Sequence, residues 1–176
     1  DSMFDMAKGL DQERARRAAA LSLLELLNYG VTTTQENHWT HFHIHSTDGI
    51  CDAIQESGMR AVVSRGLNDV SKYRPPEFCE DAQAVLKDLD RLEDKYDSDR
   101  IQITSEPCTI LRAKPETILA MQEWAQQRDK IWHIHLAQDD EEMEEERIAE
   151  VEEERVEELQ EEEIVVGAIL PEGKSS

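Results

Sequence analysis

The stretch Thr47-Asp-Gly-Ile-Cys-Asp-Ala-Ile-Gln-Glu-Ser-Gly-Met-Arg-Ala-Val-Val-Ser64 predicts a helix, a turn and a strand in direct succession. Residues 47–57 predict the helix, and Ser57-Gly58 closes it, because glycine readily adopts the left-handed conformation of a helix end. The following residues, 59–64, include β-branched valines and predict a strand. A helix that leads directly into a strand is a repeating part of βαβ units, so this stretch favours an α/β fold with a parallel sheet.

The same alternation continues in both directions along the chain. We expect further helices over residues 11–28, 78–96 and 114–128, and further strands over residues 31–34, 101–104, 131–136 and 164–166. Asp11 is suited to cap the first helix, Gly30 to end it, and Pro115 to occupy the first turn of the last. About five parallel strands result, whereas a closed (β/α)8 barrel needs eight. The sequence therefore predicts either a small open sheet or a (β/α)8 barrel that is present only in part.

Length and composition indicate one globular domain. The chain has 176 residues, of which 39 % are apolar, and no stretch approaches the roughly 18 to 20 apolar residues that span a bilayer. The first residues lack both the basic and the apolar region of a signal peptide, and position 1 is not a methionine. Cys51, Cys79 and Cys108 form no CxxC pair, which argues against a disulfide framework or a cysteine zinc site. We expect a reducing, cytoplasmic setting.

The negative charge is concentrated in one segment. The formal net charge is −21, and residues 139–163 contain sixteen Asp or Glu against two arginines, which leaves −7 for the rest of the chain. This segment predicts a solvated acidic helix with a thin apolar stripe, between a domain over residues 1–138 and a short strand and tail over residues 164–176. The charge would repel phosphates and anionic lipid, so we expect neither nucleic acid nor a membrane as a partner.

His133 and His135 are the first candidate metal ligands. They lie two residues apart on a predicted strand, so both side chains point to the same face of the sheet. In a barrel this face would look inward, and His135 would lie nearer the carboxyl end of the strand, where barrel active sites are built. A neutral imidazole there can bind Zn²⁺ or Fe²⁺, and such an ion activates water at neutral pH. The structural alternative is a pair of interior histidines held by hydrogen bonds.

A second group of histidines alternates just after the strand expected over residues 31–34. If the chain is extended there, His41, His43 and His45 share one face and could bind a metal ion. Because polar residues surround them, the segment is more typical of a loop, in which these imidazoles would face solvent or substrate. Both interpretations remain open from the sequence alone.

Four segments carry a family resemblance in this order: residues 26–34, 56–63, 101–108 and 133–138. They begin with Leu26-Leu-Asn-Tyr-Gly-Val-Thr-Thr-Thr34 and end with His133-Ile-His-Leu-Ala-Gln138. Together they resemble the amidohydrolase superfamily, specifically its branch of cytosine and guanine deaminases and triazine hydrolases. The resemblance covers about residues 12–140. It implies a (β/α)8 barrel that holds one Zn²⁺ or Fe²⁺ ion and hydrolyses or deaminates C–N bonds of small heterocycles.

The resemblance also implies roles for single residues. In the family the metal ligands are an HxH pair on the first strand, one His each on the fifth and sixth strands, and an Asp on the eighth. His135 matches the fifth-strand ligand and His133 its neighbour on that strand. Gln138 stands where the family usually has a Glu that shuttles protons, and its amide can form hydrogen bonds but cannot titrate. The histidines at positions 41, 43 and 45 follow their strand and do not match the first-strand pair.

Residues 164–169 bring no histidine where the sixth-strand ligand belongs, and the first-strand pair and the eighth-strand Asp would lie beyond the two ends of the chain. A single imidazole does not hold a catalytic metal, so we expect a fragment of an amidohydrolase that is inactive alone. The alternative function is a non-catalytic metal-binding or scaffold protein that uses His41, His43 and His45. Unpaired sheet edges favour association, so a homo-oligomer is among the expected states.

Overall fold

The computed structural model describes residues 2–73, 75–136, 140 and 143–144. Gln138, most of the predicted acidic helix and the predicted strand over residues 164–166 lie outside the described residues. Residues Asp1–His135 form one compact unit, which contains the described helices and strands named below, and Leu136–Ser176 form a second unit.

A three-stranded parallel sheet is the centre of the first unit. Strands β1 (Thr33–His38), β2 (Arg60–Leu67) and β3 (Ile101–Pro107) lie in the order β1-β2-β3. Their register aligns Glu36 with Val63 and Ile103. All three strands were predicted, and each extends beyond its predicted end by three or four residues because these additional residues continue the parallel ladder.

The predicted helices are present with small shifts at their ends. They are α2 (Gln12–Asn28), α3 (Ser46–Ser57), α4 (Ala82–Tyr96) and α5 (Pro115–Gln126), preceded by the short α1 (Ser2–Lys8). The side chain of Asp11 caps α2 by accepting a hydrogen bond from the Arg14 amide (2.9 Å). Gly58 ends α3 with φ of 72°, as expected for a left-handed cap. The helix predicted over residues 78–96 begins at Ala82, and Phe78 belongs instead to a separate 3-10 turn over residues 76–78.

The predicted strand over residues 131–136 is wrong as a regular strand. Its described backbone runs along β3, but its strand pairing is limited to one parallel bridge, between Thr109 and His135. The amides of His133 and His135 donate to the carbonyls of Ser105 (3.2 Å) and Cys108 (3.1 Å). The segment therefore follows β3 without forming a continuous ladder, and among the described residues the sheet has three regular strands.

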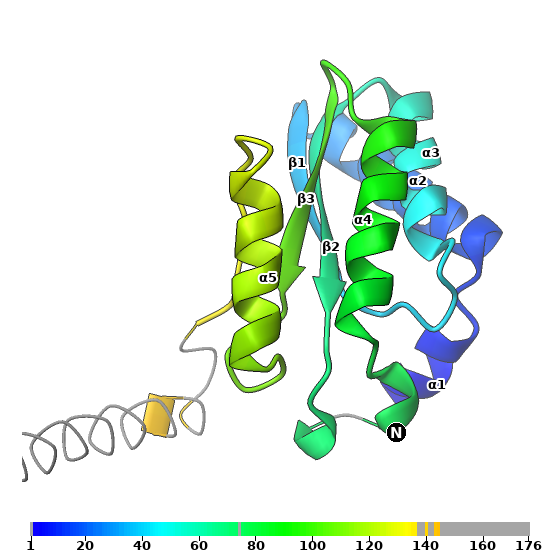
Figure 1. Ribbon diagram of the computed structural model, residues 1–176. Helices are drawn as coiled ribbons and strands as arrows, with labels where there is room; N and C mark the ends of the chain where they lie inside the picture. The colour runs from blue at the N-terminus through cyan, green and yellow to red at the C-terminus, as the bar shows by residue number, and fades with distance from the viewer. Residues whose placement is uncertain (1, 74, 137–139, 141–142, 145–176) are drawn as a thin grey trace, which may run out of the picture. The chain divides into compact units, whose positions relative to one another are not determined.

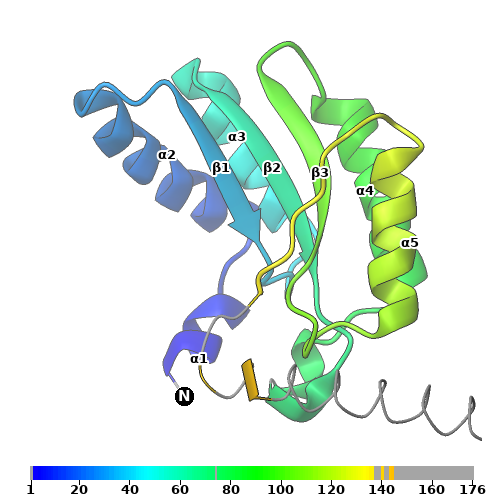
Figure 2. The ribbon, with the colours of Figure 1, turned by 90° about the vertical axis from the view of Figure 1, so that its left-hand side faces the viewer.

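Helices α2, α3 and α4 lie behind the sheet in the view of Figure 2, and α5 lies beside its β3 edge. Residues 131–135 follow the same edge, where they hydrogen-bond to β3 and to the residue after it. Val63 and Ile103 point to the helix side and are fully buried. Because side chains alternate along a strand, the residues next to them in sequence point to the opposite face. None of the described helices is long and apolar enough to cross a membrane.

Helices α2 and α3 touch most closely at Gly49. A Cβ atom at this position would lie 2.0 Å from the backbone oxygen of Gln12 and 2.9 Å from the backbone nitrogen of Arg16. Both atoms belong to the backbone of α2, so neither can rotate away. The absence of a side chain at Gly49 is therefore a packing requirement.

We expect Gly49→Ala to lower the free energy of unfolding by about 1–3 kcal/mol or more, because α3 must move away from α2. Urea denaturation followed by circular dichroism measures this change. Gly9→Ala is the matched control, since the nearest atom to its added Cβ is the end of the flexible Arg14 side chain, at 3.3 Å. Equal stability of the two variants would contradict the close approach of the helices.

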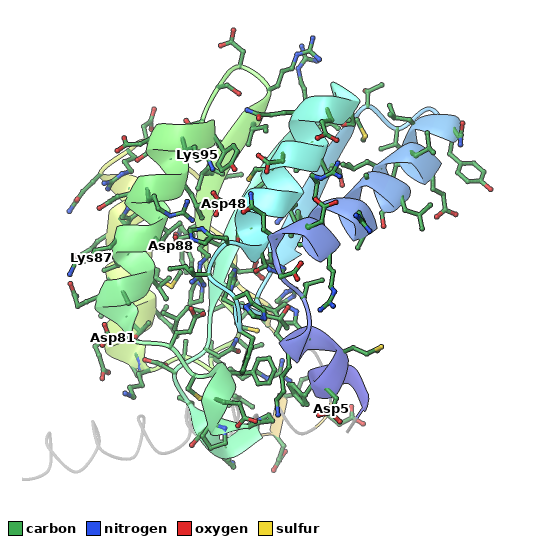
Figure 3. The ribbon with its side chains drawn as sticks, turned by 90° about the vertical axis from the view of Figure 1, so that its right-hand side faces the viewer. Asp5, Asp48, Asp81, Lys87, Asp88 and Lys95 are labelled. Carbon is green, nitrogen blue, oxygen red and sulfur yellow. The ribbon has the colours of Figure 1, made fainter. Side chains whose placement is uncertain are left out.

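A buried carboxylate joins α3 to α4. Asp48 is 1 % exposed and accepts hydrogen bonds from both Nη atoms of Arg91 (2.8 and 2.7 Å) and from Lys95 Nζ (2.8 Å). Figure 3 shows Asp48 between the two helices, with Lys95 beside it. Burial alone would raise the pKa of Asp48, but the hydrogen bonds from Arg91, Lys95 and His45 hold this pKa well below its ordinary value.

Because the pKa of Asp48 is lowered in the folded chain, its contribution to stability is present above the unfolded pKa, about 3.9 for an aspartate, and is lost as the pH falls further. We expect Asp48→Asn to unfold more easily than the unchanged chain at pH 6, with a difference that narrows between pH 4 and pH 2. Urea titrations across this range measure the difference. A constant difference at every pH would show that the charge of Asp48 is not the stabilising feature.

Candidate metal centre and strand-end site

The helix-free face of the sheet carries polar side chains toward the carboxyl ends of its strands. Ser64 aligns with Thr104 across β2 and β3, and Glu106 follows two residues later on β3. The alternation of strand side chains therefore places these three on one face, opposite Val63 and Ile103. All three are fully buried. In parallel α/β folds, ligand sites form at this edge of the sheet.

The segment with the two histidines is fixed to this face at its beginning. Asp129 has φ of 53°, which turns the chain sharply after α5. Lys130 is then held by Glu93 (2.7 Å) and Asp97 (2.9 Å) and donates to the carbonyl of Ile103 (3.1 Å). The Thr104 hydroxyl donates to the carbonyl of Ile131. These contacts direct the following residues along β3.

His133 reaches from this segment to the middle strand of the sheet. Its Nδ1 atom lies 3.1 Å from the hydroxyl oxygen of Ser64, in hydrogen-bonding geometry. Burial, together with the neighbouring His135, lowers the pKa of His133. The ring is therefore neutral at pH 7 and has its orientation fixed by Ser64, which suits a metal ligand or the neighbour of one.

His135 lies against a buried carboxylate at the end of β3. Its Nε2 atom is 3.0 Å from Oε1 of Glu106. The imidazole is 43 % exposed, whereas the Glu106 side chain is fully buried. The contact does not have the geometry of a hydrogen bond, and neither Oε atom of Glu106 has a hydrogen-bond partner among the described residues. Burial, with the like charge of Glu36 nearby, raises the pKa of Glu106 to about 8.

The structure thus brings His133 and His135 to one edge of the sheet, as predicted, and adds Glu106. Sequence reasoning gave Glu106 no role. The available signal was its position directly before Pro107-Cys108 at the end of a predicted strand, on the same face as Thr104. That signal needs the register of β3 to be known, which the sequence does not give.

The second group of histidines lies in a loop, as predicted. Both ring nitrogens of its first member, His41, form hydrogen bonds within the protein. The His41 side chain is fully buried, and Arg65 Nη1 donates to its Nδ1 atom (2.8 Å). Because arginine only donates hydrogen bonds, the proton of neutral His41 is on Nε2, which donates to the Thr47 hydroxyl (3.0 Å). No ring nitrogen of His41 is left to bind a metal ion.

The other two loop histidines have separate partners. His43 Nε2 donates to the backbone oxygen of Lys8 (3.0 Å), and His45 Nδ1 lies 3.2 Å from Asp48 Oδ2. Within the described part of the chain, no group of three or more His, Cys, Asp or Glu side chains could hold a metal ion together. The alternative in which His41, His43 and His45 converge on one metal ion is therefore wrong for this structure.

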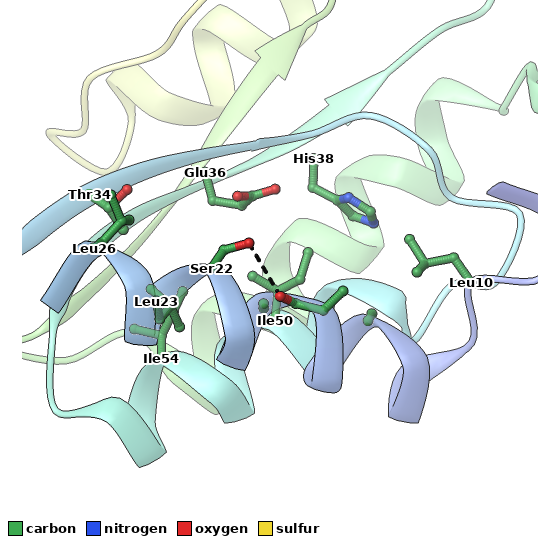
Figure 4. A pocket seen from close by; sticks show the side chains of 12 residues that line it. Leu10, Ser22, Leu23, Leu26, Thr34, Glu36, His38, Ile50 and Ile54 are labelled. Carbon is green, nitrogen blue, oxygen red and sulfur yellow. Dashed lines mark hydrogen bonds between the residues drawn. The ribbon is translucent and has the colours of Figure 1, made fainter. Parts of the chain in front are cut away.

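A cavity on the other side of β1 is distinct from the strand-end site. It has a volume of about 230 Å³ and lies between α2, α3 and β1 (Figure 4). Its lining is mostly aliphatic, and Glu36 and His38 point into it from the strand. Burial raises the pKa of Glu36 and lowers that of His38. Both side chains share the helix face of the sheet with Val63, so they do not join the histidine pair.

Comparison with known proteins identifies the family. A model of the amidohydrolase family matches residues 2–170. The chain belongs to the amidohydrolase family. An 8-oxoguanine deaminase from Pseudomonas aeruginosa is 31 % identical over 147 residues, which cover 78 % of this chain and 33 % of the relative. A 5-methylthioadenosine/S-adenosylhomocysteine deaminase from Thermodesulfovibrio yellowstonii is 29 % identical over 140 residues, covering 79 % and 30 %. This amidohydrolase chain spans about a third of the length of these relatives.

Solved structures agree with this assignment. An atrazine chlorohydrolase variant from Arthrobacter aurescens, complexed with zinc and atraton, matches with a TM-score of 0.63 and 25 % identity over 70 % of this chain and 30 % of that one. The guanine deaminase of E. coli matches with a TM-score of 0.65 and 20 % identity over 80 % and 33 %, and shows likeness of fold. These neighbours are barrels of the amidohydrolase type, whereas the chain described here shows a three-stranded parallel part.

We expect Arg65→Met to lower the free energy of unfolding by about 3–5 kcal/mol, because the partly buried Glu80 loses its guanidinium partner and the buried Asp88 keeps only Arg91. Thermal and urea denaturation measure the loss. Arg17→Met is the matched control, because the 74 % exposed Arg17 side chain pairs with Glu13 on the surface, where an ion pair contributes less than about 1 kcal/mol. Similar losses in both variants would contradict a special role for Arg65.

Proposed function

We propose that this amidohydrolase chain forms part of a metal-dependent hydrolase or deaminase that acts on C–N bonds of small heterocycles. One observation carries the proposal: His133 and His135 lie together at the carboxyl end of a parallel sheet, beside a buried carboxylate without a hydrogen-bond partner in the described part of the chain. The resemblance of residues 12–140 and the similarity to a deaminase of 8-oxoguanine support the heterocycle as the substrate class.

Each proposed site residue has a separate task. His135, half exposed at the strand end, acts as a metal ligand. His133 acts as its neighbour, with its ring held by the Ser64 hydroxyl. Gln138 stands where the family pattern usually has a proton shuttle, and it lies outside the described residues. Its amide donates and accepts hydrogen bonds but does not carry a proton between atoms.

The ion would be zinc or iron. Such an ion supplies a nucleophile at neutral pH by lowering the pKa of its bound water to about 7. The orphaned oxygens of Glu106 and the neutral imidazole of His133 fit a site for a cation. The described residues do not make a complete coordination shell, so other groups must add donors before the chain can hold the ion tightly or act on a substrate. We therefore propose that this chain is inactive alone.

The competing function, a metal-binding scaffold built on the loop histidines, is not favoured. His41 has both ring nitrogens in hydrogen bonds, and the partners of His43 and His45 belong to different elements of the structure. A scaffold that needs these three donors would require the loop to unfold and Arg65 to lose a buried contact.

Metal binding tests the proposal directly. The full 176-residue chain is titrated with Zn²⁺ in competition with a coloured chelator, and its bound metal is measured after gel filtration. We expect His135→Ala to bind at least 10-fold more weakly than the unchanged chain, since a ligand is at least as important as the outer partners whose loss costs 10–100-fold. His45→Ala, which alters an exposed imidazole, is the control and should bind as before.

Two results would reject the proposed site. The first is equal zinc affinity in the unchanged chain and in His135→Ala. The second is a loss of zinc only when His41, His43 and His45 are all replaced by alanine, which would move metal binding to the loop. Circular dichroism of each variant shows whether the fold is kept.

A further inference from the structure

Glu106 is a buried acid whose burial the contacts of the described residues do not explain. Its side chain is fully buried at the end of β3, and neither carboxylate oxygen has a hydrogen-bond partner among the described residues. A buried carboxylate without partners costs several kcal/mol, so buried acids are normally paired, hydrogen-bonded or bound to a metal ion. The other buried acids described above follow this rule: Asp48 pairs with Arg91 and Lys95, and Asp88 with Arg65.

The surroundings of Glu106 offer no other cation in the described part of the chain. Its one charged contact is Nε2 of His135, and the nearby Glu36 adds a like charge. Arg65, the closest buried arginine along the sheet, points to the helix face and is occupied by Asp88 and Glu80. Among the described residues, the imidazole of His135 is therefore the one side chain whose positive charge could compensate Glu106.

The distance between His135 and Glu106 fits two donors of one ion. Nε2 and Oε1 are 3.0 Å apart, but without hydrogen-bond geometry. Zinc bonds to histidine nitrogen and carboxylate oxygen are about 2.0–2.2 Å long, so two donors of the same ion lie about 2.9–3.4 Å apart, depending on the coordination angle.

We propose that the carboxylate of Glu106 is a ligand of the same divalent ion as His135. This inference rests on the proposed function, because it places the ion of that site between the end of β3 and the segment 131–136. Glu106 then supplies a charged oxygen donor, and its burial is compensated by the ion. Once deprotonated, the carboxylate adds a negative charge to the site, which favours a divalent cation over a neutral ligand.

The test measures metal affinity and the ligand field, without any assay of activity. The full chain, Glu106→Gln, His135→Ala and Glu36→Gln are each titrated with Zn²⁺ in competition with a coloured chelator. The same proteins are loaded with Co²⁺, whose visible absorption reports the donors and their number. Glu36→Gln is the matched control, because it removes a neighbouring partly buried carboxylate on the opposite face of the sheet.

We expect Glu106→Gln to weaken Zn²⁺ binding at least 10-fold and to change the Co²⁺ spectrum, while Glu36→Gln does neither. Without metal, Glu106→Gln should unfold at the same or a higher temperature, since it removes an unpartnered buried charge. Added Zn²⁺ should raise the melting temperature of the unchanged chain more than that of the variant.

The outcomes separate the inference from the proposed function. If His135→Ala loses zinc and Glu106→Gln keeps it with an unchanged Co²⁺ spectrum, Glu106 is not a ligand and the proposed function stands. If neither substitution alters zinc binding, both the inference and the proposed site are overturned. If Glu106→Gln and Glu36→Gln weaken Zn²⁺ binding equally, the loss of affinity comes from removing a nearby negative charge of any kind. The assignment of Glu106 as a ligand then fails.

Discussion

The guanidinium of Arg65 is the interaction on which the rest of this structure depends. It is 1 % exposed on β2 and binds Asp88 of α4, Glu80 before that helix and His41 of the loop after β1. A buried cation of this kind is tolerated only when several acceptors surround it. Those acceptors come from three separate segments, so satisfying one charge fixes the positions of a strand, a helix and two loops. His41 takes its place as a consequence.

The alternation of strand side chains then divides the sheet into two surfaces with different tasks. On the helix side, charged groups such as Arg65 and Asp88 neutralise one another among the aliphatic side chains of the core. On the other side, Ser64 and Glu106 face the segment that carries His133 and His135. Arg65 and Asp88 on the first surface are paired, whereas neither carboxylate oxygen of Glu106 on the second surface has a hydrogen-bond partner among the described residues. The buried ion pairs and the residues of the candidate site therefore lie on opposite faces of the same strands, at positions that alternate along each strand.

This chain departs from the family pattern that it resembles at Gln138, where the pattern has a titrating carboxylate and this chain has an amide. Beside the matching histidine, the structure adds Glu106, a buried carboxylate whose oxygens have no hydrogen-bond partner among the described residues. The similarity to deaminases extends over most of this chain but only a third of theirs. The features described here therefore concern one side of an amidohydrolase site.

The sequence by itself determined the order of helices and strands, since helix caps such as Asp11 and Gly58 and the runs of β-branched residues act locally. It also placed His133 and His135 together, because a spacing of two needs no tertiary information in an extended chain. The pairing of residues 131–136 was not predictable, because a ladder depends on the neighbouring strand rather than on β propensity. Only the tertiary structure decided that His41 is occupied by Arg65 and that Glu106 meets His135, since these contacts join residues 24 and 29 positions apart through the register of a parallel sheet.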